Sequence, residues 1–83
     1  MKVLDFYGDY CGPCKALAPI LEKVANEKGL EIKKINIEED VDDLSAKYGV
    51  RGIPTVIIVD ENYNEIKRFS GMKQEAALRE FFE

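Results

Sequence analysis

The chain has 83 residues, of which 46% are hydrophobic, so it can form one small domain with a modest core and is too short for a second. Its 16 acidic and 12 basic residues give a net charge of −4, which argues against a nucleic-acid-binding protein or a polybasic membrane patch. No stretch approaches the roughly 18 apolar residues that a membrane-spanning helix needs.

The cysteine and histidine contents narrow the possible chemistry further, because there are two cysteines and no histidines. Two cysteines are too few for a disulfide-stapled secreted scaffold. The N-terminal segment Met1–Asp5 reaches a carboxylate after two apolar residues, unlike a signal peptide. We therefore expect a cytoplasmic protein, in which a Cys-x-x-Cys pair is catalytic or metal-binding rather than structural. The lack of histidine removes the usual acid/base group of neutral pH.

The first half of the chain predicts a strand, a helix and a second strand. Val3–Tyr7 is apolar on both faces, as in a strand buried within a parallel sheet. A turn at residues 8–10 leads to a helix over residues 11–28, whose apolar residues recur along one face at helical spacing. Gly29 is expected to end this helix. The second strand is predicted over residues 31–37.

The second half predicts a short helix over residues 41–48, two strands and a last helix over residues 73–82. Thr55–Val59 is β-branched throughout and is expected to be a central strand. Turn residues then lead to an antiparallel strand over residues 65–69. The order β-α-β-α-β-β-α indicates an α/β fold. We expect a four-stranded mixed sheet with two helices on one face and one on the other.

Cys11-Gly12-Pro13-Cys14 lies where the first strand turns into the first helix. Unpaired N–H groups give a helix start a partial positive charge, which favours a thiolate there. Cys11 is nearer the helix start and is the expected nucleophile. The sulfur of Cys14 lies one turn away, close enough to form a disulfide. Pro13 suits the first helical turn, and the neutral Gly12-Pro13 pair adds no cation to stabilise the thiolate.

Two metal-binding alternatives are weaker. The cysteines could form half of a zinc site shared by two chains, but no histidine and no second Cys-x-x-Cys pair is present. The acidic residues at 38–43 lack calcium-loop spacing, and we expect them to cap the helix that follows. In that helix Val41, Leu44 and Tyr48 are expected on one side.

Two further side chains near the motif stand out. Asp5 is a carboxylate within an apolar strand, where burial would raise its pKa; a solvent-facing strand position is the alternative. Tyr10 precedes the first cysteine and is expected to form part of an exposed apolar rim for docking. Tyr7 suits core packing as well as it suits a function.

The chain resembles the thioredoxin family in five segments, which run in the family's order and cover nearly the whole sequence. They are Leu4-Asp5-Phe6-Tyr7, Cys11-Gly12-Pro13-Cys14-Lys15, Ala18-Pro19-Ile20-Leu21, Tyr48-Gly49-Val50-Arg51-Gly52-Ile53-Pro54-Thr55, and Gly71 before the last helix. A Cys-x-x-Cys motif alone is a weak signal, whereas the same motif followed by Gly-Ile-Pro-Thr at a strand start is specific. The resemblance implies one thioredoxin-like domain over residues 1–83.

The printed sequence departs from the family in beginning at the strand that leads into the Cys-x-x-Cys motif, without the family's usual first strand and helix. We therefore expect a sheet of four strands, with one edge of the strand over residues 31–37 uncovered. Lys33 and Lys34 would discourage edge-to-edge pairing there. The tryptophans that usually flank the motif appear as Tyr7 and Tyr10.

The resemblance also implies roles for particular residues. Cys11 would attack a substrate disulfide, and Cys14 would then release the reduced substrate. Asp5 matches the carboxylate that takes the proton of the second cysteine, and Lys34 matches the lysine that pairs with it; for Lys34 a plain edge-strand lysine is the alternative.

Substrate binding is implied for Tyr10, Gly12, Pro13 and Gly71, and for the segment Ile53-Pro54. The family match predicts a cis peptide bond between Ile53 and Pro54, which would place the Ile53 backbone opposite the first cysteine for strand-like binding of substrate. A trans proline at the start of the strand is the alternative.

The implied activity is that of a protein-disulfide reductase that binds no cofactor and takes electrons from NADPH through a flavin-dependent thioredoxin reductase. Such a protein is a monomeric electron carrier in redox homeostasis. Three alternatives stay open: a glutathione-recharged glutaredoxin-like protein, a reductase dedicated to one partner such as ribonucleotide reductase, and a binding module. The chain's size favours the glutaredoxin alternative, whereas Gly12-Pro13 and a single Gly71 in place of Gly-Gly-x-Asp oppose it.

Overall fold

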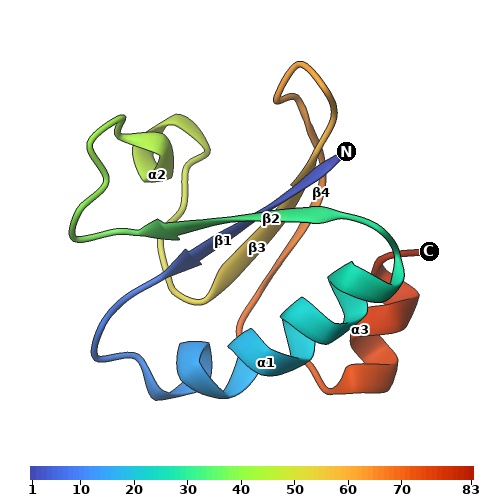
Figure 1. The fold of residues 1–83 in the computed structure, drawn as a ribbon. Coiled ribbons are helices and arrows are strands. Elements are labelled where there is room, and N and C mark those ends of the chain that lie inside the picture. Colours follow the sequence, from blue (N-terminus) through green and yellow to red (C-terminus); the bar gives the residue numbers. More distant parts are fainter.

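Four strands form one mixed sheet in the order β2-β1-β3-β4 in the computed structural model, which describes all of residues 1–83 (Figure 1). β1 (Lys2–Tyr7) pairs in parallel with β2 (Glu31–Asn36) and antiparallel with β3 (Thr55–Val59). β3 also pairs antiparallel with β4 (Glu65–Ser70). All five residues of β3 are buried, as predicted for a central strand.

Helices cover both faces of this sheet. α1 (Gly12–Glu27) and α3 (Glu75–Phe81) pack together on one face, and α2 (Leu44–Lys47) lies over the other (Figure 1). This arrangement confirms the predicted fold class and the predicted distribution of helices. None of the helices combines the length and the apolar composition that spanning a membrane would require.

The sheet separates two hydrophobic clusters, one on each face. The cluster beneath α1 and α3 consists of Val3, Leu17, Leu21, Val24, Val56 and Leu78. The opposite cluster consists of Leu4, Phe6, Ile35, Ile57 and Val59, with Leu44 and Tyr48 of the α2 region packed against it. Because successive residues of β1 point to opposite faces, its apolar run supplies both clusters.

α2 is shorter than the helix predicted over residues 41–48. Asp43 adopts a left-handed conformation with φ of 54°, so the helix begins only at Leu44. The Asp40 carboxylate accepts hydrogen bonds from the backbone N–H groups of Leu44 (2.9 Å) and Ser45 (2.8 Å). The expected acidic cap is therefore present, and Asp40 supplies it. Val41 lies outside this helix and is 95% exposed, so the prediction that it shares one helix side with Leu44 and Tyr48 was wrong.

Two other elements are slightly shorter than predicted. β2 ends at Asn36, one residue before the predicted end, and α3 begins at Glu75, two residues after the predicted start. Gly29 has φ of +69° and follows α1, as expected of a residue that ends a helix. β2 forms an edge of the sheet, in agreement with the prediction of an uncovered strand.

Candidate redox site

Cys11 and Cys14 are joined by a disulfide at the start of α1, with their Cα atoms 5.2 Å apart. Cys11 is the N-cap residue, and its Sγ accepts a hydrogen bond from the backbone N–H of Cys14 at 3.2 Å. Pro13 lies in the first helical turn. The sulfur of Cys11 therefore occupies the position at which a helix favours negative charge. The two cysteines are similarly enclosed, with exposed fractions of 9% for Cys11 and 6% for Cys14.

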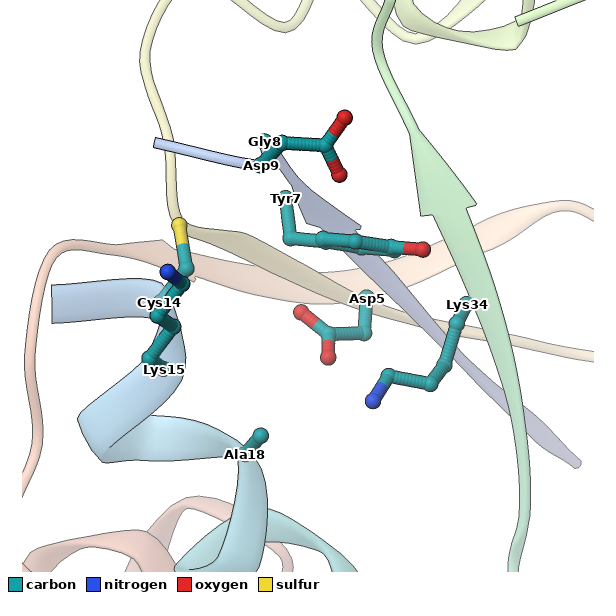
Figure 2. Close-up of a pocket in the computed structure, with 8 residues that line it drawn as sticks. All are labelled: Asp5, Tyr7, Gly8, Asp9, Cys14, Lys15, Ala18 and Lys34. Atoms are coloured by element: carbon teal, nitrogen blue, oxygen red, sulfur yellow. The ribbon is translucent and has the colours of Figure 1, made fainter. Parts of the chain in front are cut away.

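A cavity of about 160 Å³ opens beside the disulfide on the α1 face of the sheet (Figure 2). Its lining residues are Asp5, Tyr7, Gly8, Asp9, Cys14, Lys15, Ala18 and Lys34. Figure 2 shows the Asp5 side chain between Cys14 and Lys34. The buried carboxyl of Asp5 and the second cysteine, Cys14, therefore line the same cavity.

Asp5 is 4% exposed, so the alternative of a solvent-facing residue was wrong. Burial raises the pKa of its carboxyl; Lys34 opposes this effect and Glu22 adds to it. Asp5 lines the cavity, and no polar side-chain atom in the structure is fully buried without a hydrogen-bond partner. A carboxyl whose pKa is raised keeps its proton to higher pH than an exposed aspartate does, and its ionised form is a stronger base.

Lys34 is the register partner of Asp5 on β2, as the sequence predicted for neighbouring strands. Its ammonium is nevertheless not ion-paired with Asp5. The Nζ atom lies 4.0 Å from Oε1 of Glu22 and 5.5 Å from the centroid of the Tyr7 ring. Lys34 therefore acts on Asp5 only at longer range.

The peptide bond between Ile53 and Pro54 is cis, which confirms the prediction and excludes the trans alternative. The Pro54 carbonyl accepts a hydrogen bond from the backbone N–H of Gly71 at 2.9 Å. Gly71 has φ of +85°, a conformation that glycine adopts without strain. These three residues of the predicted substrate-binding set are therefore neighbours.

The remaining members of that set lie at the surface beside the disulfide. Tyr10 is 94% exposed, as expected of a docking rim, and Gly12 and Pro13 are also exposed. Tyr7 is half-buried and lines the cavity instead. No group of three or more Cys, Asp or Glu side chains is arranged to hold a metal ion.

Comparison with known proteins agrees with this geometry. The family model described as Thioredoxin matches residues 1–83. The chain belongs to the thioredoxin family. Thioredoxin of Mycolicibacterium smegmatis is 40% identical over 79 residues, which cover 92% of this chain and 70% of that protein. Thioredoxin of Bacillus subtilis strain 168 is 38% identical over 78 residues, covering 92% of this chain and 73% of that protein.

Solved thioredoxin structures are also similar. Thioredoxin 1 of Thermosipho africanus TCF52B has a TM-score of 0.84 at 32% identity and covers 99% of this chain and 90% of that chain. A mutant thioredoxin of Halobacterium salinarum NRC-1 has a TM-score of 0.82 at 33% identity and covers 95% of this chain and 68% of that chain. Family membership and the disulfide-forming cysteine pair identify the chain as a thioredoxin-type thiol–disulfide oxidoreductase.

Two residues of this thioredoxin-family site were missed by the sequence analysis. Gly8 was assigned only to a turn, but a Cβ atom at this position would lie 2.8 Å from Cδ1 of Ile53, so a larger residue here would displace the end of that side chain. Glu22 lies on an exposed helical position, and nothing in the sequence distinguishes it from other surface glutamates. Its contact with Lys34 becomes visible only in the folded chain.

Proposed function

We propose that this chain reduces protein disulfides through a dithiol–disulfide cycle in which Cys11 attacks and Cys14 resolves. The observation that carries the proposal is the position of Cys11 as N-cap of α1, with its Sγ accepting the Cys14 N–H. A thiolate at this position gains the same hydrogen bond and the partial positive charge of the helix start.

The cycle has two exchange steps. The Cys11 thiolate attacks a substrate disulfide, forms a mixed disulfide and releases one substrate sulfur as a thiolate. Cys14 then gives its proton to Asp5 and attacks the Cys11 sulfur, which breaks the mixed disulfide and releases the second substrate sulfur. The substrate gains two electrons, and the chain ends with the Cys11–Cys14 disulfide seen in the structure.

The same proposal assigns the surface beside the disulfide to substrate binding. An extended substrate segment would pair with the Ile53 backbone next to the cis proline, Pro54. Gly71 adjoins Pro54 through a backbone hydrogen bond. Tyr10, together with the exposed Gly12-Pro13 segment, would contact apolar side chains near the substrate disulfide.

The oxidised chain must be reduced again to turn over. We propose that a flavin-dependent thioredoxin reductase supplies electrons from NADPH, in a reducing compartment such as the cytoplasm, and that residues 1–83 act as one monomeric domain. The support is family membership.

Cys14→Ser tests the order of the two exchange steps. We expect this variant to accumulate a mixed disulfide when mixed with a peptide that contains one disulfide, because Cys11 still attacks and no thiol resolves the product. Mass spectrometry measures the adduct, which dithiothreitol should remove.

Cys11→Ser is the matched control, because it keeps one cysteine in the motif and should form little adduct. Equal adduct formation by both variants would contradict the assigned roles. Binding of the peptide that survives dithiothreitol, without any adduct, would instead support a binding module.

A further inference from the structure

The ammonium of Lys34 pairs with Glu22 and not with Asp5, although Lys34 and Asp5 face one another in the register of β1 and β2. Figure 2 shows the Lys34 side chain pointing from β2 toward α1 and ending short of that helix. Its ammonium lies 4.0 Å from Glu22 and above the Tyr7 ring, whereas no ion pair joins it to Asp5. The carboxylate with which this ammonium forms an ion pair therefore belongs to a residue outside the cavity lining.

Few charged groups surround Asp5. β2 contributes Lys34, α1 contributes Lys15 and Glu22, the turn after β1 contributes Asp9, and β3 contributes none. Lys34 favours the ionised form of Asp5, and Glu22 favours the protonated form. Asp9 accepts a hydrogen bond from the side-chain amide of Asn36 at 2.9 Å, on the other side of the cavity.

Glu22 is placed to act on Lys34 from the helix that carries the cysteines. It lies one turn beyond Ala18, which itself lies one turn beyond Cys14, so the three residues follow one stripe of α1. Both Glu22 and Lys34 are half-exposed, so the ion pair leaves the ammonium in contact with solvent.

We propose that Glu22 is a positioning residue for thiol–disulfide exchange: it holds the Lys34 ammonium away from the Asp5 carboxyl, which stays free to take the proton of Cys14. The inference rests on the proton-accepting role proposed above for Asp5. An ammonium in direct contact with Asp5 would stabilise the carboxylate and make it a weaker base. With Glu22 present, Lys34 favours the Asp5 carboxylate only from a distance and does not neutralise it.

Glu22→Gln tests the inference in the oxidised protein. Without the carboxylate, Lys34 can turn toward Asp5, so the titration of the Asp5 carboxyl should move to lower pH. The ratio of ionised to protonated Asp5 at fixed pH should rise about two- to fivefold, the range expected of a half-exposed ion pair. Carboxyl ¹³C NMR measures this titration, with Asp5→Asn assigning the signal.

Glu31→Gln is the matched control, because Glu31 is an exposed glutamate on β2 outside the cavity. It removes the same charge and should leave the Asp5 titration unchanged. A shift of equal size in both variants would overturn the inference, because net charge alone would then explain the effect.

Lys34→Met separates positioning from a direct effect of the Glu22 charge. If Glu22 acts through Lys34, Glu22→Gln should shift the Asp5 titration little in the Lys34→Met background. An undiminished shift in that background, or no shift in either, would overturn the inference.

The pH profile of substrate release gives an independent readout. In Glu22→Gln the rising limb should move to lower pH with the Asp5 titration. An unmoved profile despite a moved titration would overturn the role of Glu22 in exchange. If Asp5→Asn itself does not slow release, the proposed role of Asp5 fails instead, and the NMR result still reports on the Glu22–Lys34 contact.

Discussion

Asp5 is the residue whose surroundings depart most from those of an ordinary carboxyl. It is buried on β1, it faces the cavity that Cys14 also lines, and burial raises the pKa of its carboxyl. A raised pKa makes the carboxylate a stronger base, so it can take a proton from a thiol that water would remove only slowly. The same burial lowers the stability of the folded protein when Asp5 is ionised, because a charged group is disfavoured in a buried position.

Asp5→Asn should slow the release step and spare the first attack. We expect release of substrate from the mixed disulfide to fall at least about tenfold at pH 7, because no other carboxyl lines the cavity near Cys14 except the hydrogen-bonded Asp9. Stopped-flow measurement of the two exchange steps with a disulfide peptide separates them. Unchanged release between pH 6 and 8 would contradict the role of Asp5.

The stability of the same variant shows whether slow release reflects a folding defect. The folded-state pKa of Asp5 is raised above its usual 3.8, so its contribution to stability is full below pH 4 and is lost as pH rises through the raised value. Asp5→Asn removes this loss. The variant should therefore be more stable than the parent by about 1–3 kcal/mol at pH 8, with the difference shrinking toward pH 4 in urea unfolding.

At the scale of elements, the helices and strands with a regular hydrophobic pattern could be predicted from the sequence. α1 and β3 have long regular patterns, and both were placed correctly to within a residue or two. The start of α2 was misplaced, because it depends on the left-handed conformation of Asp43 and on the hydrogen bonds of Asp40. Such loop chemistry leaves no periodic signal in the sequence.

Asp40→Ala should loosen α2, because the Asp40 carboxylate is the only side chain that accepts hydrogen bonds from the first N–H groups of this four-residue helix. Loss of a cap of ordinary strength should lower the melting temperature by about 4–8 °C near neutral pH. Thermal unfolding followed by circular dichroism measures the change.

The pH dependence identifies the cause of that change. The hydrogen bonds from Ser45 and Leu44 lower the pKa of Asp40, so its contribution is present above the unfolded-state pKa and is lost as pH falls through the folded value. The difference between Asp40→Ala and the parent should therefore vanish in acid. Asp42→Ala is the matched control, since Asp42 is exposed and caps nothing, and an equal drop in both variants would contradict the argument.

At the scale of the whole molecule, the family motifs indicated the main residues of the candidate redox site. Its remaining features depend on contacts between segments that are distant in the sequence. The motifs in the sequence were enough to indicate Cys11, Cys14, Asp5 and the cis proline. Gly8 closely approaches the Ile53 side chain, and Lys34 of β2 contacts Glu22 of α1. Neither contact follows from local pattern, because each joins segments that only the folded sheet brings together.

The redox state should also change the stability of the whole molecule. The Cys11–Cys14 disulfide closes a very short loop, so its constraint on the unfolded chain stabilises the oxidised fold by about 2 kcal/mol. In the reduced protein a Cys11 thiolate at the N-cap of α1 recovers part of this difference through its hydrogen bond and the helix dipole. We therefore expect the reduced protein to unfold at lower urea concentration than the oxidised one, with a stability difference of no more than about 2 kcal/mol.

Urea unfolding followed by circular dichroism, with and without dithiothreitol, measures the difference in a chain that has no tryptophan. The double variant Cys11→Ser/Cys14→Ser is the control and should unfold identically under both conditions, at a stability near that of the reduced parent. A reduced parent as stable as the oxidised one would contradict the constraint argument. Since folding and reduction form one thermodynamic cycle, the difference in stability also fixes how much harder the disulfide is to reduce in the folded chain than in the unfolded one. A fold that stabilises its own disulfide only slightly keeps both redox states accessible, as a protein that cycles between them requires.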